Sequence, residues 1–195
     1  MGLFGWFGKK PHDRGVRAWR EAWAAAVAAL DASAVPGLEA ALRQVPPLAD
    51  DVEVEEEMLD ALRQLLALEG ELAASRLPSV ETTHRVVGTD GCHFSAPVSV
   101  PDDPAQPTGR LLLTSTRAVF AGGARTPALP WHAVREVVQT GRDLIFVVGR
   151  AAAGGDALGG SAGDGQRFRC NSFAEALRGA AIARHLLRRA RTPRL

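Results

Sequence analysis

Cysteine is scarce in this sequence, and long apolar runs are missing. Its 195 residues include only two cysteines, Cys92 and Cys170, with no C-x-x-C spacing, which excludes a disulfide framework and most zinc-site patterns. No apolar run approaches the roughly 18 residues that span a bilayer. The first ten residues, MGLFGWFGKK, carry their positive charge after the apolar residues, the reverse of a secretory signal. We therefore expect a cytoplasmic protein, with a peripheral position at the inner membrane surface as the alternative.

Lysine is scarce as well, and the charge is unevenly divided. Arginine supplies 21 of the 23 basic residues, in a composition rich in Ala and Gly. Residues 1–77 hold 8 basic and 13 acidic residues, and residues 78–195 hold 15 and 9, which gives net charges of −5 and +6. The hydrophobic fraction of 46% is ordinary for a folded domain. Because arginine is the default cation here, the basic half does not by itself identify a partner.

The first half of the chain has the periodicity of α-helices. Between residues 13 and 32, apolar side chains recur three or four positions apart, which places them on one face of a helix. A shorter helix is expected over 38–45, where a Pro-Pro pair stops it, and a third over about 50–75. The glutamates within 53–57 favour the positive end of the helix dipole and are expected to be solvated rather than to form a carboxylate site. An acidic helical region is therefore predicted over 13–77.

The second half changes to the period of two that is typical of β-strands. Turn signals rich in Gly, Pro, Asp and Ser separate short segments rich in Val, Leu, Ile and Phe. We predict strands over 80–88, 92–100, 109–114, 117–122, 134–140, 143–149 and 166–170. Ser172 and Glu175 have the spacing of a capping box and predict a helix to about residue 189. The expected fold class is α+β: an N-terminal helical region, then a seven-stranded antiparallel barrel or sandwich capped by a C-terminal helix.

Four stretches of the second half carry a family resemblance. They are GRLLLTSTRAVFAGG (109–123), LPWHAVREVV (129–138), DLIFVV (143–148) and RFRCNSFAEALRGAAIARHLL (167–187). A glycine, an apolar strand, a Thr-containing turn, an arginine, an apolar-Phe strand and a Pro-aromatic step follow one another in this order. The pattern resembles the pleckstrin-homology-like superfamily, in its GRAM-type or bacterial branch, over about residues 80–190. The resemblance implies a module that binds lipid headgroups or peptides, and fold alone does not fix which.

Lipid-headgroup recognition in that superfamily usually depends on basic residues around the first strand-to-strand loop. The corresponding predicted loop here, 88–91, contains one Asp and no Lys or Arg. The remaining candidate for an anionic ligand is an arginine rim made of Arg85, Arg110, Arg117 and Arg125. This departure from the lipid-binding pattern favours recognition of a protein.

The N-terminal arm, residues 1–12, is the sharper membrane signal. Aromatic side chains favour the headgroup boundary, and lysines beside them are attracted to anionic lipid. The candidate membrane-contact residues are Leu3, Phe4, Trp6, Phe7, Lys9 and Lys10. Two other interpretations stay open, in which the arm contacts nothing or packs against the helical region.

Patterns that suggest catalysis, metal or nucleic acid are weak. The segment GGSAG at 159–163 matches the G-x-S-x-G nucleophile motif but lacks the strand before it and the helix after it that the motif needs. Cys92 and His93 are adjacent on a predicted strand, where neighbouring side chains point to opposite faces, so they rarely share a metal ion. The basic run RHLLRRARTPRL (184–195) lacks helix-turn-helix and zinc-finger patterns and is expected to be a solvated helix end.

These observations favour a non-enzymatic adaptor in which a PH/GRAM-like domain and a helical region recognise a protein partner, with no cofactor, no metal and no small-molecule substrate. The predicted parts are the arm (1–12), the acidic helical region (13–77), a PH/GRAM-like domain (80–190) and a basic tail (191–195). The expected partner is a protein, and nucleic acid is not expected. The alternative is a peripheral membrane protein, attached reversibly to anionic lipid through the arm and the arginine rim.

Overall fold

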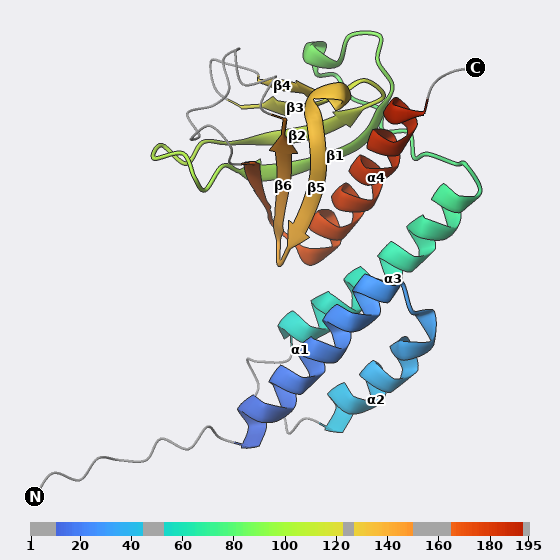
Figure 1. Ribbon diagram of the computed structural model, residues 1–195. Coiled ribbons are helices and arrows are strands. Elements are labelled where there is room, and N and C mark those ends of the chain that lie inside the picture. Colours follow the sequence, from blue (N-terminus) through green and yellow to red (C-terminus); the bar gives the residue numbers. More distant parts are fainter. Residues whose placement is uncertain (1–10, 45–52, 123–126, 150–164, 193–195) are drawn as a thin grey trace, which may run out of the picture. The chain divides into compact units, whose positions relative to one another are not determined.

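The chain forms two compact units, which are described one at a time. A computed structural model describes residues 11–44, 53–122, 127–149 and 165–192. The first unit covers residues 1–66 and the second covers residues 67–195. Figure 1 shows the helices of the first unit and the sheet of the second.

Three α-helices make up the described part of the first unit. They are α1 (Pro11–Ala29), α2 (Val35–Gln44), which follows the short 3-10 helix η1 (Ala32–Ala34), and α3 (Glu53–Ala73), whose last residues belong to the second unit. The first helix ends earlier than predicted. Leu30 has a φ of 52° and is 43% exposed, so it does not continue the apolar stripe.

Two tryptophans of α1 join the three helices. Trp19 and Trp23 are four residues apart, so they share one face of the helix, and both are buried. The Trp19 Nε1–H donates to the carbonyl oxygen of Leu38 at 2.9 Å, and the Trp23 Nε1–H donates to that of Met58 at 2.6 Å. Each indole therefore buries apolar surface and satisfies its polar atom on a neighbouring helix.

One glutamate at the start of α3 is not solvated as predicted. Glu55 is 1% exposed, and its Oε1 accepts a hydrogen bond from Arg20 Nε at 2.7 Å and lies 2.5 Å from Arg20 Nη2 in an ion pair. Glu53 and Glu56 are exposed, as expected for the positive end of a helix dipole. The acidic cluster is therefore divided between an inward ion pair and a solvated face.

The second unit is built on one antiparallel sheet. Its strands are β1 (Cys92–Ser99), β2 (Thr108–Thr114), β3 (Arg117–Ala121), β4 (Ala128–Pro130), β5 (Val134–Thr140), β6 (Asp143–Val148) and β7 (Gln166–Cys170), and helix α4 (Phe173–Arg191) follows them. The strand order is β4-β3-β2-β1-β7-β6-β5, so β4 and β5 are the edges of an open sheet. The predicted α+β class, with seven antiparallel strands and a C-terminal helix, is confirmed, but the strands form one sheet that is not closed into the expected barrel (Figure 1).

The strands β4-β3-β2-β1 and the strands β7-β6-β5, which meet where β1 pairs with β7, share one core. β1 and β7 pair over only two residue positions, and the strands on either side of this junction contact each other through aromatic rings. The ring centroid of Phe120 on β3 lies 5.7 Å from that of Phe168 on β7, which lies 5.8 Å from that of Phe146 on β6. Trp131, in the 3-10 helix η3 (Trp131–Ala133), extends this aromatic core and is 1% exposed.

The β2–β3 hairpin depends on two glycines that lie against one aromatic ring. A Cβ on Gly109 would lie 2.8 Å from a ring carbon of Phe120 and 2.6 Å from the carbonyl oxygen of Ala121. A Cβ on Gly122 would lie 2.6 Å from the Phe120 Cζ. The glycines of the GRLLLTSTRAVFAGG stretch therefore leave the space that the Phe120 ring occupies in the core.

Helix α4 begins at the predicted capping box. The Glu175 backbone N–H donates to Ser172 Oγ at 3.1 Å, and the Ser172 backbone N–H donates to the Glu175 carboxylate at 3.2 Å. The helix packs closely on the sheet, because a Cβ on Gly179 would lie 2.8 Å from Leu144 Cδ1. The helix therefore covers the core of the second unit from one side.

One predicted strand is wrong, and one real strand was missed. Residues 80–88 form no strand, and their end is the 3-10 helix η2 (Arg85–Val87). A local turn sets this conformation, because the His84 backbone N–H donates to Thr82 Oγ1 at 3.2 Å and Gly88 has a φ of 62°. The missed strand is β4, which is only three residues long and too short to show a period of two.

Candidate functional site

The predicted membrane-contact residues lie outside the described residues. They are Leu3, Phe4, Trp6, Phe7, Lys9 and Lys10, and Arg125 of the arginine rim and the 159–163 motif also fall outside. Among the helices that are described, none is long and apolar enough to cross a membrane. Attachment to a membrane through the arm therefore stays a prediction from the sequence.

The described arginines of the predicted rim do not gather at one point. Arg110 pairs with Ala121 at the open end of the β2–β3 hairpin, and its Nε donates to Ser95 Oγ at 3.0 Å. Arg117 begins β3 at the opposite, turn end of the hairpin. About four residues of strand lie between them, or roughly 13 Å along the strand. Arg85 lies on the separate helix η2 and is exposed.

The first strand-to-strand connection differs from the predicted one. Because residues 80–88 are not a strand, β1 is the first strand, and the chain reaches β2 through residues 100–107. This connection contains Asp102 and Asp103 and no basic residue. An anionic headgroup would therefore meet negative charge there.

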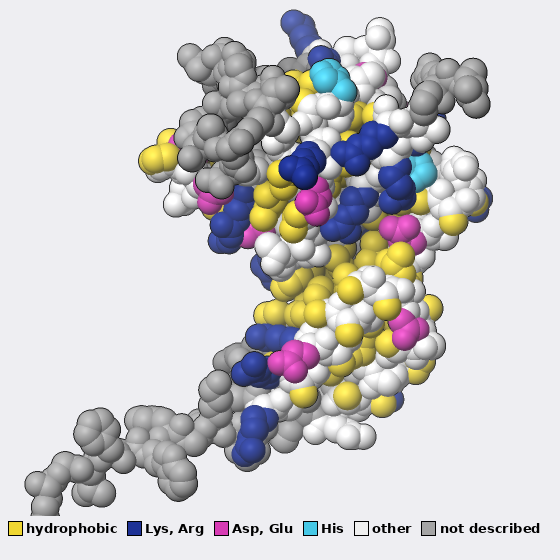
Figure 2. Space-filling model, in the orientation of Figure 1, with side chains coloured by type: hydrophobic (Ala, Val, Ile, Leu, Met, Phe, Trp, Pro, Cys, Tyr) yellow, Lys and Arg dark blue, Asp and Glu magenta, His cyan; other side chains and the backbone are white. Residues whose placement is uncertain are grey.

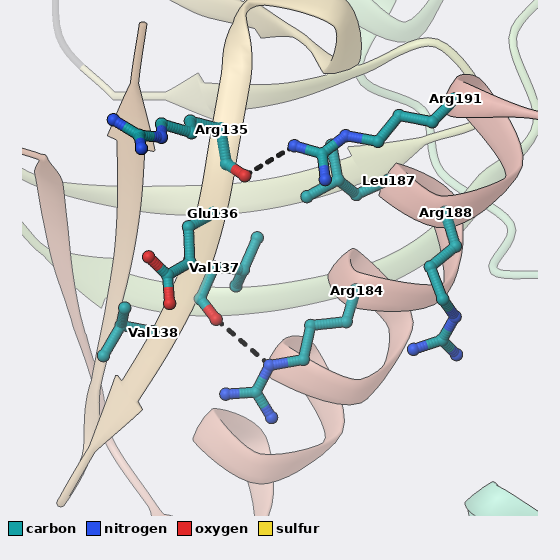
Figure 3. Close-up of a pocket in the computed structure, with 8 residues that line it drawn as sticks. All are labelled: Arg135, Glu136, Val137, Val138, Arg184, Leu187, Arg188 and Arg191. Atoms are coloured by element: carbon teal, nitrogen blue, oxygen red, sulfur yellow. Dashed lines mark hydrogen bonds between the residues drawn. The ribbon is translucent and has the colours of Figure 1, made fainter.

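A groove lies instead between the edge strand β5 and helix α4. It has a volume of about 340 Å³, and its lining residues are Arg135, Glu136, Val137, Val138, Arg184, Leu187, Arg188 and Arg191. Val137 and Leu187 are buried and form its apolar floor. Figure 3 shows Arg184 and Arg191 extending from α4 towards β5, whereas the side chain of Arg135 extends away from the helix. We refer to Arg135, Arg184, Arg188 and Arg191 as the groove arginines.

Two groove arginines bind the backbone of the edge strand. Arg184 Nε donates to the carbonyl oxygen of Val137 at 3.0 Å. Arg191 Nη2 donates to the carbonyl oxygens of Val134 at 3.3 Å and Arg135 at 2.5 Å. The Val137 carbonyl points away from β6, so Arg184 occupies a position where an N–H group of another strand would bind, whereas Arg191 binds where the β5–β6 register shifts, between Val134 and Glu136.

The groove carries strong positive charge. Four arginines and one glutamate line it, which gives a net charge of +3. Figure 2 shows the dark-blue side chains gathered on the face of this unit where Figure 1 places β5 and α4. Within the part of the chain that the structure describes, the groove arginines form no salt bridge with Glu136 or with any other acid.

A second arginine cluster in the same unit is neutralised. Asp143 is 4% exposed and accepts hydrogen bonds from both Arg167 and Arg169, with Nε distances of 2.9 and 2.8 Å. The hydrogen bond from Arg169, followed by that from Arg167, holds the pKa of Asp143 below its usual value despite its burial. Arg167 also lies 3.5 Å from Asp102. This cluster joins β6 to β7 and presents no free charge to a ligand.

The two thiols are poor nucleophiles. Burial, with smaller effects from the charges of Glu175 and Asp143, raises the pKa of Cys170 to about 12. Burial also raises the pKa of Cys92, whose Sγ donates to the carbonyl oxygen of Phe94. Both thiols are therefore protonated at neutral pH, and the thiolate is the reactive form.

One serine lies close to a histidine. His93 Nε2 is 2.9 Å from Ser115 Oγ, and its Nδ1 is 2.7 Å from the carbonyl oxygen of Pro78. The carbonyl can only accept, so Nδ1 donates to it and the other nitrogen of the neutral ring accepts from the serine hydroxyl. The backbone N–H of Ser115 donates to the carbonyl oxygen of Gly91 at 3.0 Å and is not directed at a reacting group. No set of three or more metal-ligating side chains is found in the described ranges.

Comparison with known proteins adds no assignment, because no protein-family model and no curated protein matches the sequence. The sequence does not predict the groove, although it contains part of the signal. The basic run that begins at Arg184 predicts a solvated helix end. Two of its arginines instead bind β5, and a contact across 47 sequence positions has no signature in local periodicity.

Proposed function

We propose that this chain is a non-enzymatic binding protein of the pleckstrin-homology-like, GRAM-type class, whose second unit recognises a segment of a partner protein. The strand arrangement and the terminal helix support this assignment, because the four stretches that carry the resemblance fall on β2–β3, β4–β5, β6 and β7–α4. The partner segment binds in an extended conformation along β5, in the groove beside α4.

The observation that carries the proposal is the long unpaired edge at β5. β4, at the other edge, has three residues, whereas β5 has seven. Residues whose backbone groups point away from the neighbouring strand alternate along an edge. Val137 is one such residue, because its carbonyl oxygen meets Arg184 rather than β6, and Gln139, two positions later, has the same orientation. An extended peptide can add a strand to such an edge while a neighbouring groove receives its side chains.

A proline at position 139 tests this binding mode. Peptides are selected from a displayed random library on the full-length protein, and the affinity of each is measured for the wild type, Gln139→Pro and Gln139→Ala. Both variants lose the hydrogen bond from the Gln139 side chain to Gly141, but only the proline lacks the outward N–H. We expect affinity to fall about tenfold in the proline variant and to be retained in the alanine variant. Equal binding to all three proteins would exclude the β5 edge.

Attachment to anionic membranes is the competing function. It is tested by flotation of the full-length chain, and of a version that lacks residues 1–10, on neutral and anionic vesicles. Flotation of the full-length chain alone, weakened by salt, would show that the arm binds lipid. If neither protein floats and selected peptides bind β5, recognition of a protein is the function.

A further inference from the structure

The groove arginines differ from the other arginines of the second unit that lie near acids. Arg167 and Arg169 share the carboxylate of Asp143, whereas the described residues offer the groove arginines no ion pair. Guanidinium groups stay charged at any physiological pH. The three guanidinium groups that α4 carries at the groove, those of Arg184, Arg188 and Arg191, repel one another and are stabilised by an anion that binds among them. The groove therefore favours a negatively charged occupant.

Arg184 and Arg191 are held by acceptors that a carboxylate can replace. Their present partners are neutral backbone carbonyls. A carboxylate carries a full negative charge and can accept two parallel N–H groups from one guanidinium, which makes the stronger hydrogen bond. Movement of the guanidinium alone would leave the carbonyls of β5 without donors. An added strand supplies those donors from its own backbone.

On the basis of the proposed function, we propose that the occupant of the groove is an acidic extended peptide that exchanges partners with these two arginines. Carboxylates of the peptide accept hydrogen bonds from the guanidinium groups of Arg184 and Arg191. Backbone N–H groups of the peptide then donate to the carbonyl oxygens of Val137 and Arg135. The two guanidinium groups and the two carbonyl oxygens of Val137 and Arg135 therefore each have a partner before and after binding. In the free protein the two arginines cover the edge of β5, and an acidic segment uncovers it.

The spacing of the contacts specifies the peptide. The carbonyls of Arg135 and Val137 are two residues apart on β5, or about 7 Å. Alternate side chains of an added strand have the same spacing and point to the same face. Acidic residues at alternate positions, with a β-branched residue between them, therefore match the two arginines. Arg188 makes no side-chain hydrogen bond among the described residues and is available to a third acid.

A peptide fits these contacts better than an isolated anion. A phosphate or a lipid headgroup can attract the guanidinium groups, but it has no row of N–H groups for the carbonyls that they leave. The apolar floor formed by Val137 and Leu187 likewise matches the β-branched side chains of a strand rather than a hydrated headgroup.

The test compares two peptides on the full-length protein. One contains Val-Glu-Val-Glu-Val between Gly-Ser ends, and the other replaces both glutamates with glutamines. Affinities are measured by calorimetry, and amide hydrogen exchange is followed along β5. We expect the glutamate peptide to bind about tenfold or more tightly than the glutamine peptide. It should also slow exchange at Val137 and Gln139, and lose affinity when salt is raised from about 0.05 to about 0.5 M.

Matched variants assign the effect to the groove. Arg184→Gln with Arg191→Gln should remove the preference for glutamate, whereas Arg178→Gln, an exposed arginine of the same helix outside the groove, should keep it. The comparison of peptides on the wild type does not depend on the folding of any variant.

A glutamine peptide that binds as tightly as the glutamate peptide and protects β5 equally would overturn the arginine exchange but leave the proposed function standing. Failure of both peptides to protect β5 would overturn the exchange. If peptides selected from the library also leave β5 unprotected, the proposed function fails too. Flotation on anionic vesicles that the double variant loses would then assign the groove to lipid.

Discussion

Arg184 donates from Nε to the carbonyl oxygen of Val137 at 3.0 Å, and thereby ties the last helix to the edge strand of the sheet. The carbonyl points out of the sheet, towards the position that a further strand would occupy. Unpaired edges invite association with other chains, and charged side chains over an edge reduce it. In the free protein, we therefore expect the same hydrogen bond to satisfy this carbonyl and to protect the edge of β5 from other chains.

Removing this side chain should expose the edge. Arg184→Ala is expected to lower the free energy of unfolding by about 1 kcal/mol, because one part-buried hydrogen bond is lost. The larger effect is expected in sedimentation velocity at high protein concentration, where the variant should self-associate more than the wild type. Arg178→Ala removes the same charge from the same helix and serves as the control. Identical sedimentation of the two variants would show that Arg184 does not protect β5.

The Asp143 carboxylate should stabilise the second unit in a pH-dependent way. Asp143→Asn keeps the size of the side chain but removes the charge that Arg167 and Arg169 share, which should cost roughly 1–3 kcal/mol near neutral pH. Arg169, followed by Arg167, holds the pKa of Asp143 below its usual value. A carboxyl whose pKa is lowered by folding contributes stability above its unfolded pKa of about 3.9, and this contribution is lost as the pH falls through the folded pKa.

The difference in unfolding free energy between the wild type and Asp143→Asn should therefore shrink as the pH is lowered from about 6 to about 3. Denaturant unfolding at several pH values measures it, with Arg17→Gln as a control in which an exposed helical ion pair is lost. A difference that stays constant over this range would mean that the carboxylate's charge is not what stabilises the cluster.

The two kinds of glycine in the second unit should respond to alanine in opposite directions. Gly109→Ala would bring a Cβ to 2.6 Å from the carbonyl oxygen of Ala121, a backbone atom that the hairpin holds in place. We expect a loss of roughly 1–3 kcal/mol. Gly70 lies in α3, is exposed, and has nothing within 4 Å of a Cβ position, so Gly70→Ala should gain about 0.5–1 kcal/mol from helix propensity. Thermal unfolding gives both shifts, and shifts of the same sign would contradict the proposed role of the hairpin glycines.

The elements that local chemistry specifies could be predicted from the sequence. The capping box at Ser172 and Glu175 places the start of α4, and the apolar run of β2 and the Phe120 strand beside it both lie in the core. The segment 80–88 has a similar apolar content, yet a side-chain hydrogen bond at Thr82 and the left-handed Gly88 turn it away from the sheet. Local hydrogen bonding and the positive φ of Gly88 therefore make this segment a turn, although its apolar pattern predicts a strand.

The groove could not be predicted in the same way. The arginines of α4 were visible in the sequence, but their acceptors on β5 are backbone carbonyls, which every residue has. Which carbonyls are free depends on β5 being an edge, and that depends on the order of all the strands. Glu55 illustrates the same limit, because only the packing of α1 beside α3 shows that one glutamate of an acidic cluster is buried beside Arg20.

The Ser115–His93 pair offers a direct test of the proposal that the protein is not an enzyme. The pair has the hydroxyl-to-imidazole distance of an activated serine, and the Pro78 carbonyl fixes the ring as an orienting group would. Acyl transfer also needs N–H donors directed at the oxyanion, and the N–H of Ser115 itself is bonded to the Gly91 carbonyl. We therefore expect a fluorophosphonate probe to leave the full-length protein unlabelled.

We expect a structural role for this pair, because it joins the turn between β2 and β3 to the segment at Pro78. Ser115→Ala should then cost about 1 kcal/mol or less, because an exposed hydrogen bond is lost without leaving a buried group unpaired. His93→Ala should cost more, because it breaks the contacts to both Ser115 and Pro78. Stoichiometric labelling of the wild type that disappears in both variants, while both remain folded by circular dichroism, would instead identify Ser115 as a nucleophile. In that case hydrolysis, rather than recognition of a partner, would be the activity to pursue.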